Sequence, residues 1–321
     1  MLPHSPDYHF CAQVQARWDQ NAEARLFRDT LEQALPDQAD RDVFKVCAGN
    51  LLYPDARFEV CVVCYGESGT SKSTMCEPLA AVLGKTLATS LSMTQLCDPK
   101  SYNLPQLRFA ALNLATELDA IELEDSSMFK RIVSGERIPA RAIYGVPFDM
   151  TPTVKLWFLS NNLPRFKHGT EAELRRTRML KFAKVPGAVD VTLKERVAAD
   201  RDGIFLFMLE GLVELMSLRT IPQGGADSQA VLQRFRVSND PIGAFLTQRC
   251  ELGVKEKVKK DLIFQAFTEF CEDNGFSDMF RDMFIRKLLE RCSGVKSKRK
   301  TEGADRTHYL VGIGLRKLEE G

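Results

Sequence analysis

The sequence has no uninterrupted apolar run of about 18 residues, the length that a membrane-spanning helix needs. Its opening residues, MLPHSPDYHF, also lack the charged-then-apolar order of a secretory signal peptide. Neither an internal repeat nor a long low-complexity tract is present, so a solenoid and a disordered chain are not indicated. We therefore expect a folded protein of the cytosol, with no membrane partner.

Histidine is scarce, and the four histidines are too dispersed to suggest a metal site. The nine cysteines are an odd number scattered through apolar segments, which argues against a disulfide framework and for a reducing compartment. Cys61 and Cys64 form a CxxC, but they lie inside an apolar run and no second CxxC accompanies them. Packing in a buried strand is the favoured interpretation, ahead of redox or zinc chemistry.

No strong excess of either charge is present, since the formal net charge is +1. A nucleic-acid partner is neither favoured nor excluded by this balance, because what matters is where basic residues cluster. The 321 residues, 44% of them hydrophobic, are enough for about two domains at roughly 100–200 residues each.

Apolar periodicity divides the chain into three parts. Residues 13–52 predict a helical N-terminal segment, and the expected domains are 1–52, 53–222 and 223–321. Short apolar runs alternate with helices in the middle part, which predicts an α/β sheet domain; the runs are 58–64, 86–92, 108–114, 154–160 and 178–182. An amphipathic helix is expected at 194–219, followed by a turn-rich hinge at 221–227. Helices at about 241–250, 259–274 and 280–292 precede a basic hairpin, which suggests a winged-helix domain.

A glycine-rich loop follows the first of these strands and opens a helix, as a P-loop does. Its residues are Gly66, Glu67, Ser68, Gly69, Thr70, Ser71, Lys72, Ser73 and Thr74. Backbone N–H groups would wrap the phosphates of ATP, Lys72 would reach the outer phosphates and Ser73 would bind Mg²⁺. The strict pattern has glycine directly before the lysine, where this chain has Ser71. A serine fits there if φ is negative or if strain is tolerated. We therefore expect Ser71 to alter the affinity for nucleotide and not the identity of the loop as a P-loop.

An ATPase also needs carboxylates at the end of a neighbouring strand. Glu117 is the first choice for the catalytic carboxylate and for the Mg²⁺ shell, and Asp119 is its helper or a ligand of the metal shell. A solvated strand end is the alternative for this segment. Three further acidic residues, Glu122, Glu124 and Asp125, are expected to begin the next helix, where negative charge suits the helix dipole.

Two later segments carry polar chemistry. Asn161 ends a buried strand run, so its amide could bind a γ-phosphate or the attacking water, with Asn162 as the fallback. Arg175 and Arg176 follow the last strand of the sheet that carries polar chemistry, and a guanidinium delivered to a neighbour's γ-phosphate would neutralise transition-state charge. Arg176 is preferred over Arg175. A turn and a solvated basic segment are the alternatives for these two sites.

Basic residues gather near the C-terminus. From Arg286 to Lys317 there are ten basic and three acidic residues, which indicates a phosphate-binding surface or, as the alternative, a solvated hairpin. The expected DNA contacts there are Lys296, Lys298, Arg299 and Lys300. Residues 135–150 also predict two short strands around Tyr144-Gly145.

These blocks together resemble the superfamily 3 helicases, in particular the helicase portion of phage and plasmid primase-helicases and their poxvirus relatives. The resemblance runs through residues 58–182 and rests on the loop at Gly66, the segment of Glu117, residues 129–141, the strand ending at Asn161 and the arginines that follow. It implies a modified AAA+ P-loop core that assembles as a ring, often a hexamer, with ATP sites between subunits. Asn161 matches the family's polar sensor, and the 135–150 hairpin would carry Arg141 and Tyr144 into a channel that holds single-stranded DNA.

The resemblance therefore predicts an ATP-dependent DNA helicase of phage, plasmid or mobile-element replication, working in a bacterial cell or a virus-infected host. A primase or another replication protein is an implied further partner. Two rival hypotheses stay open. One is a replication initiator or loader that uses ATP to assemble on DNA without unwinding it, and the other is a small-molecule kinase whose ATPase ignores DNA.

Overall fold

The computed structural model describes residues 5, 7, 12–116, 122–123, 126–163, 165–166, 171–185, 190, 192–274, 276, 279–302 and 305–316. The chain forms two compact units, residues 1–235 and 236–321. In the described part, no helix is both long and apolar enough to cross a membrane.

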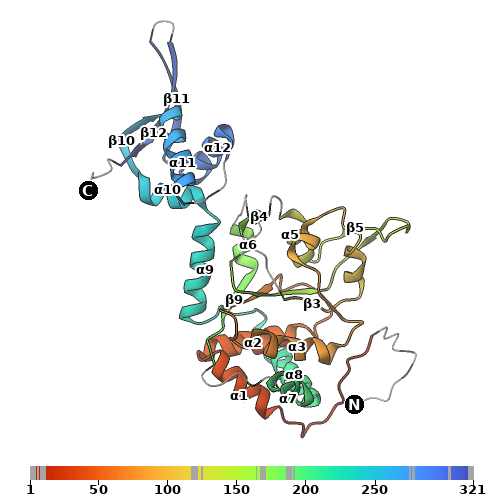
Figure 1. The fold of residues 1–321 in the computed structure, drawn as a ribbon. Coiled ribbons are helices and arrows are strands. Elements are labelled where there is room, and N and C mark those ends of the chain that lie inside the picture. The colour runs from red at the N-terminus through yellow and green to blue at the C-terminus, as the bar shows by residue number, and fades with distance from the viewer. Residues whose placement is uncertain are drawn as a thin grey trace. The chain divides into compact units, whose positions relative to one another are not determined.

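A five-stranded parallel sheet forms the centre of the first unit (Figure 1). Its strands, in spatial order, are β2 (Ala88–Thr89), β3 (Leu112–Ala115), β7 (Lys155–Ser160), β1 (Cys61–Tyr65) and β9 (Thr177–Lys181). Each of the five predicted apolar runs contains or overlaps one of these strands, so the expectation of an α/β fold is confirmed. Strands covered on both faces read as continuous apolar runs, which is why the sequence reveals them.

Side chains of the central strands alternate between two apolar clusters. Val62 and Cys64 face one cluster, whereas Cys61 and Val63 face the other. The first cluster is covered by α1 (Arg25–Ala34), α2 (Gln38–Asn50), α3 (Lys72–Leu83), α7 (Leu193–Ala199) and α8 (Arg201–Leu218), which lie together on one side of the sheet (Figure 1). The second is covered by α4 (Met93–Cys97), the 3-10 helix η2 (Leu104–Arg108), α5 (Ser127–Val133), α6 (Glu171–Arg176) and part of α9 (Ala226–Ser238). The predicted packing role of the CxxC is confirmed, because both thiols are buried.

The N-terminal helices belong to this same core. Phe44 of α2 packs edge-on against Trp157 of β7 at 5.4 Å between ring centroids, and Phe27 of α1 packs against Phe207 of α8 at 5.2 Å. Aromatic pairs at these distances add to the stability that burial alone provides. Residues 1–52 are therefore not a unit of their own, in contrast to the predicted boundary at 52/53.

The turn-rich segment after α8 is not a hinge. Arg178 of β9 donates hydrogen bonds to the carbonyls of Ile221 and Pro222, and buried Asp40 accepts one from the Gly225 amide at 2.7 Å. The helix α9 that follows was not predicted, and its Val231 is fully buried in the sheet core. Because α9 is anchored there, the unit boundary falls after residue 235 and not at 222/223.

After α9, the described residues of the second unit form three helices and a three-stranded antiparallel sheet. Its elements, in chain order, are α10 (Pro241–Arg249), β10 (Cys250–Lys259), α11 (Lys260–Asn274), α12 (Arg281–Arg291), β11 (Lys296–Glu302) and β12 (Asp305–Leu315), and the sheet order is β10-β12-β11. The three predicted helices and the basic hairpin are confirmed, whereas β10 was not predicted. A phenylalanine cluster holds the helices together, with Phe267 and Phe284 stacked at 4.2 Å.

Candidate active site

The loop between β1 and α3 lies at the carboxyl edge of the sheet. The strand β1 is flanked by β7 and β9, and Tyr65 pairs in register with Ser160 of β7. The Gly66 amide then donates a hydrogen bond to the Ser160 carbonyl at 3.1 Å. Ligands of open parallel sheets bind at this edge, where adjacent strands leave in different directions.

Lys72 is the first residue of α3 and folds back over this loop. Its ammonium donates to the carbonyls of Gly66 and Glu67, at 2.6 and 2.7 Å, and to the Thr70 hydroxyl at 3.1 Å. A fourth bond of 2.9 Å reaches the Asn161 side-chain oxygen, directly after β7. The structure thus joins two residues that lie 89 positions apart and that the sequence assigned to the same reaction.

All four acceptors of Lys72 are neutral groups. The residue is only 9% exposed, and burial lowers the pKa of its ammonium below the ordinary value. A buried cation is costly unless an opposite charge compensates it. The loop therefore suits an anionic group that would take over the bonds now made by its own oxygens.

The loop backbone departs from ordinary geometry at Ser71. Its φ of 60° is left-handed, as is the φ of 80° at Gly69. Glycine adopts such conformations freely, but a serine there is strained. Of the two sequence alternatives for Ser71, negative φ or tolerated strain, the structure has the second. A Cβ at Gly66 would lie 2.7 Å from the Phe182 carbonyl, so that glycine is required by close packing.

The predicted carboxylates fall outside the described residues. Glu117 and Asp119 lie in the gap 117–121 that follows β3, and Glu124 and Asp125 lie in the next gap. Glu122 was expected to begin a helix but lies in β4 (Glu122–Leu123), paired with β8 (Arg165–Phe166). In the described part of the chain, no three His, Cys, Asp or Glu side chains gather as a metal site would require. Ser73, the other predicted magnesium ligand, is the second residue of α3 and partly exposed.

The three arginines at the end of α6 and the start of β9 have different surroundings. Arg176 is held inside the subunit, by an ion pair of 2.9 Å with Glu59 and a hydrogen bond of 3.1 Å to the Ser134 hydroxyl. Arg175 is exposed. Arg178 has a structural role, because its guanidinium donates hydrogen bonds to the Ile221 carbonyl. Sequence patterns gave no sign of Glu59, whose contact with Arg176 joins residues 117 positions apart in the chain.

The expected hairpin at 135–150 is present. Its strands are β5 (Ile138–Ala140) and β6 (Phe148–Met150), which pair antiparallel, and Arg141 donates to the Gly145 carbonyl at 3.0 Å across the turn. Tyr144 at the tip has a left-handed φ of 59° and a fully exposed side chain. Ile143 and Val146 beside it are also exposed. The tip is thus an apolar and aromatic projection.

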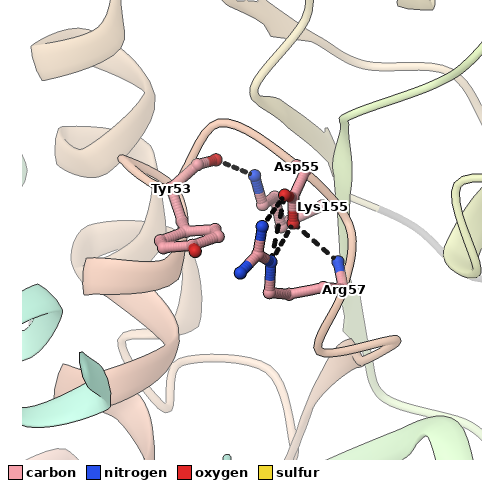
Figure 2. A network of polar contacts seen from close by, with 4 residues as sticks. All are labelled: Tyr53, Asp55, Arg57 and Lys155. Carbon is pink, nitrogen blue, oxygen red and sulfur yellow. Dashed lines mark hydrogen bonds and ion pairs between the residues drawn. The ribbon is translucent and has the colours of Figure 1, made fainter. Parts of the chain in front are cut away.

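A second buried lysine lies at the opposite end of β7. Figure 2 shows the Lys155 ammonium donating to the Tyr53 carbonyl, beside an ion pair between Asp55 and Arg57 of 2.6 Å. Burial lowers the pKa of Lys155 to about 8. The contact ties the end of α2 to the sheet, away from the Gly66–Thr74 loop.

Two family models match parts of the chain. Residues 64–176 match a family described as a family of unknown function (DUF5906), and residues 237–314 match a family described as Poxvirus D5 protein-like. The C-terminal unit is similar to the poxvirus D5-like proteins. The poxvirus likeness expected from the sequence is therefore found, but in the second unit and not in the segment that carries the loop. No curated protein matches.

Solved structures share the fold. The A form apo structure of the NrS-1 C-terminal region aligns with a TM-score of 0.58 at 10% identity, over 94% of this chain and 77% of that one. A second apo structure of the same region aligns with a TM-score of 0.57 at 10% identity, over 94% and 78%. At this identity the likeness concerns the fold, and it extends over both units.

Proposed function

We propose that the chain is an ATP-dependent DNA helicase of the superfamily 3 type, with a P-loop AAA+ core and a C-terminal winged-helix domain, acting in replication as a ring. The observation that carries the proposal is the four-bond contact of Lys72 with the Gly66–Thr74 loop and Asn161. In this contact the Lys72 ammonium, which can bind phosphate, and Asn161, which follows the neighbouring strand β7, lie together at the carboxyl edge of the sheet. The poxvirus D5-like match of the second unit supports a replication context.

Each residue in the site has a defined task in this proposal. The loop amides and Lys72 bind the phosphates of ATP, and Ser73 and Glu117 hold Mg²⁺, which neutralises charge on the transferring phosphoryl group. Glu117, helped by Asp119, activates water. Asn161 releases Lys72 when nucleotide binds and then orients the γ-phosphate or the water.

The contacts of Arg175 and Arg176 reverse the choice of the arginine that reaches the ATP site of a neighbouring subunit, which we call the finger. An arginine that serves a neighbouring subunit must extend beyond its own surface, and Arg176 is only 13% exposed and paired with Glu59. Arg175 is exposed without rearrangement. We therefore assign the intersubunit role to Arg175 and a positioning role to Arg176, the reverse of the sequence preference.

The DNA contacts in this proposal come from the hairpin tip and the second unit. Tyr144 and Arg141 offer a ring for stacking and a cation for phosphate, which suits grip without sequence preference. The exposed tip belongs to a short hairpin, β5 and β6, so it can move when the ATPase core of its subunit changes conformation. Hydrolysis would then be coupled to a moving contact, as a motor requires and a static assembly switch does not.

The test is ATP hydrolysis by the full chain, by Lys72→Ala and by the control Lys85→Ala, whose lysine is exposed in the turn that follows α3. Lys72→Ala is expected to lose turnover at least a hundredfold, about 2.7 kcal/mol of transition-state stabilisation, while its circular dichroism spectrum shows that the fold is retained. Glu117→Gln should bind ATP and hydrolyse it as slowly as Lys72→Ala does. Turnover near wild type in Lys72→Ala would exclude the loop as the catalytic site.

A further inference from the structure

The antiparallel sheet of the second unit brings together basic residues that are distant in the sequence. In one row, Lys257 of β10 pairs with Val311 of β12, which pairs with Lys296 of β11. In the next row of the same kind, Lys259 pairs with Tyr309, which pairs with Lys298. Directly opposite residues of antiparallel strands point to the same face.

The other face of this sheet is the core of the unit. Val258, between the two β10 lysines, is 8% exposed, and its partner Leu310 is fully buried. The four lysines are exposed, so they line the solvent face together with the ring of Tyr309. We call this surface the lysine face, defined by Lys257, Lys259, Lys296, Lys298 and Tyr309.

The charges of the lysine face are uncompensated. Among the described residues none of its four lysines takes part in an ion pair, and Lys257 lies over the Tyr309 ring, with its ammonium 3.9 Å from the centroid. Glu256, next along β10, lies against Gly314 instead. With strands about 4.8 Å apart and about 6.6 Å between alternate residues, the four lysine Cα atoms mark a rectangle of roughly 7 by 10 Å.

The helix α12 offers a contrast within the same unit. Its Arg281 and Arg291 are paired with Asp261 and Asp240, at 2.5 and 2.7 Å. Its Arg286 lies 4.0 Å from Glu290, one turn further on. These carboxylates reduce the charge that three of the four basic residues of α12 offer to a nucleic-acid backbone, and Lys287 is the fourth.

We infer that the lysine face, and not the helix α12, is the nucleic-acid surface of this unit, and that its ligand is a single strand. Exposed lysines around an aromatic ring on a sheet face suit a flexible backbone, which offers phosphates, and unstacked bases, which offer faces for stacking. Lys257 turns from the Tyr309 ring to a phosphate, and the ring then stacks a base. The inference rests on the proposed function, and specifies the ligand of its C-terminal domain.

The test compares two double variants of the full chain with the same loss of charge. Lys257→Gln with Lys259→Gln alters the lysine face, and Arg286→Gln with Lys287→Gln alters α12. Binding of a labelled oligothymidine is measured by fluorescence anisotropy over a range of salt concentrations. The lysine-face pair should weaken binding roughly tenfold and reduce the slope of log K against log salt by about 1.4, since each phosphate contact on a single strand adds about 0.7. The α12 pair should change neither.

Lys257→Arg with Lys259→Arg should bind as wild type, which separates loss of charge from a folding defect. Full affinity in the lysine-face pair, loss of affinity in the α12 pair, or tighter binding of a duplex of equal length would each overturn the inference alone. A wild-type chain that hydrolyses ATP but binds no oligothymidine would overturn both this inference and the DNA role in the proposed function.

Discussion

Ser71 is the residue where the chain departs from the usual phosphate-loop pattern, and its left-handed φ of 60° shows what the departure entails. A left-handed backbone disfavours residues with a Cβ by about 1–2 kcal/mol. The loop keeps the shape that glycine would give it, and Lys72 bonds to the carbonyls of Gly66 and Glu67 at its start and to the Thr70 hydroxyl near its end.

Ser71→Gly should therefore raise the free energy of unfolding by about 1 kcal/mol, measured by urea denaturation. Ser68→Gly is the matched control in the same loop, at a residue whose φ is not positive, and it should be neutral or slightly destabilising. An equal effect of the two substitutions would show that the strain at Ser71 is not significant.

Lys155 predicts a pH dependence with a definite sign. Burial lowers its folded-state pKa from 10.5 to about 8, so between these pH values the unfolded chain binds more protons, and stability rises with pH. Relative to Lys155→Met, the wild type should gain roughly 1–3 kcal/mol of unfolding free energy from pH 7 to pH 10.

The measurement is urea denaturation of both proteins at several pH values. Lys85→Met is the control, because it removes an exposed lysine without touching the Tyr53 contact. A difference between wild type and Lys155→Met that stays constant with pH would contradict the assignment of a buried, deprotonating lysine.

At the scale of elements, the helices α2 and α8 pack with their backbones in close contact. A Cβ added at Gly211 would lie 2.0 Å from the Lys45 carbonyl, and one at Gly49 would lie 2.1 Å from the Leu212 amide nitrogen. Backbone atoms cannot yield as a flexible side chain can, so the helices would have to separate.

Gly211→Ala should lower the unfolding free energy by roughly 2 kcal/mol or more, despite the better helix propensity of alanine. Gly294→Ala is its control, because a Cβ there meets nothing within 4 Å. Thermal unfolding monitored by circular dichroism gives both values, and a Gly211→Ala protein as stable as wild type would show that the two helices are not in fixed contact.

The sequence predicted elements wherever apolar periodicity was strong. The buried strands of the sheet and the helices α10, α11 and α12 lie close to their expected positions, since each buries a continuous or periodic apolar set. The hinge at 221–227 was wrong because turn residues there bond to Arg178 and Asp40, which are distant in the sequence. The strand β10 was missed although Cys250, Leu252, Val254 and Val258 stand at alternate positions in the sequence. Its bulge between Leu252 and Lys257 leaves Leu252 and Val254 exposed, so the apolar alternation does not correspond to one buried face.

The candidate site was partly predictable for a similar reason. The Gly66–Thr74 loop is formed by consecutive residues, so the spacing of its residues in the sequence predicts it. The Lys72–Asn161 contact is expected because Lys72 and Asn161 follow the carboxyl ends of the adjacent parallel strands β1 and β7. The partner of Arg176 was not predictable, because nothing near either residue indicates that Glu59 folds against it. Glu117 and Asp119 stay predictions.

At the scale of the whole molecule, an intersubunit finger can be tested by mixing subunits. Arg175→Ala and Lys72→Ala should each hydrolyse ATP at least about a hundredfold more slowly than wild type. Mixed together they should recover part of the activity, because one interface can combine an intact loop with an intact arginine. Arg176→Ala should instead lower the melting temperature, since Glu59 and Ser134 lose their partner.

Steady-state ATPase of mixtures at several ratios is the readout, after incubation long enough for subunits to exchange. Rescue of Arg176→Ala and not of Arg175→Ala would restore the sequence preference. A lack of recovery for both, with exchange verified by labelled subunits, would exclude a finger acting between subunits.

Strand displacement tests most directly whether ATP hydrolysis drives movement of this protein along single-stranded DNA. The full chain should separate a labelled forked duplex in the presence of ATP and Mg²⁺. Arg141→Ala with Tyr144→Ala should keep basal ATPase and ring assembly, since neither residue contacts the Gly66–Thr74 loop, but should lose displacement and DNA stimulation. A wild-type chain that hydrolyses ATP without displacing the strand, or a double variant that displaces it at the normal rate, would contradict the account and favour an assembly switch.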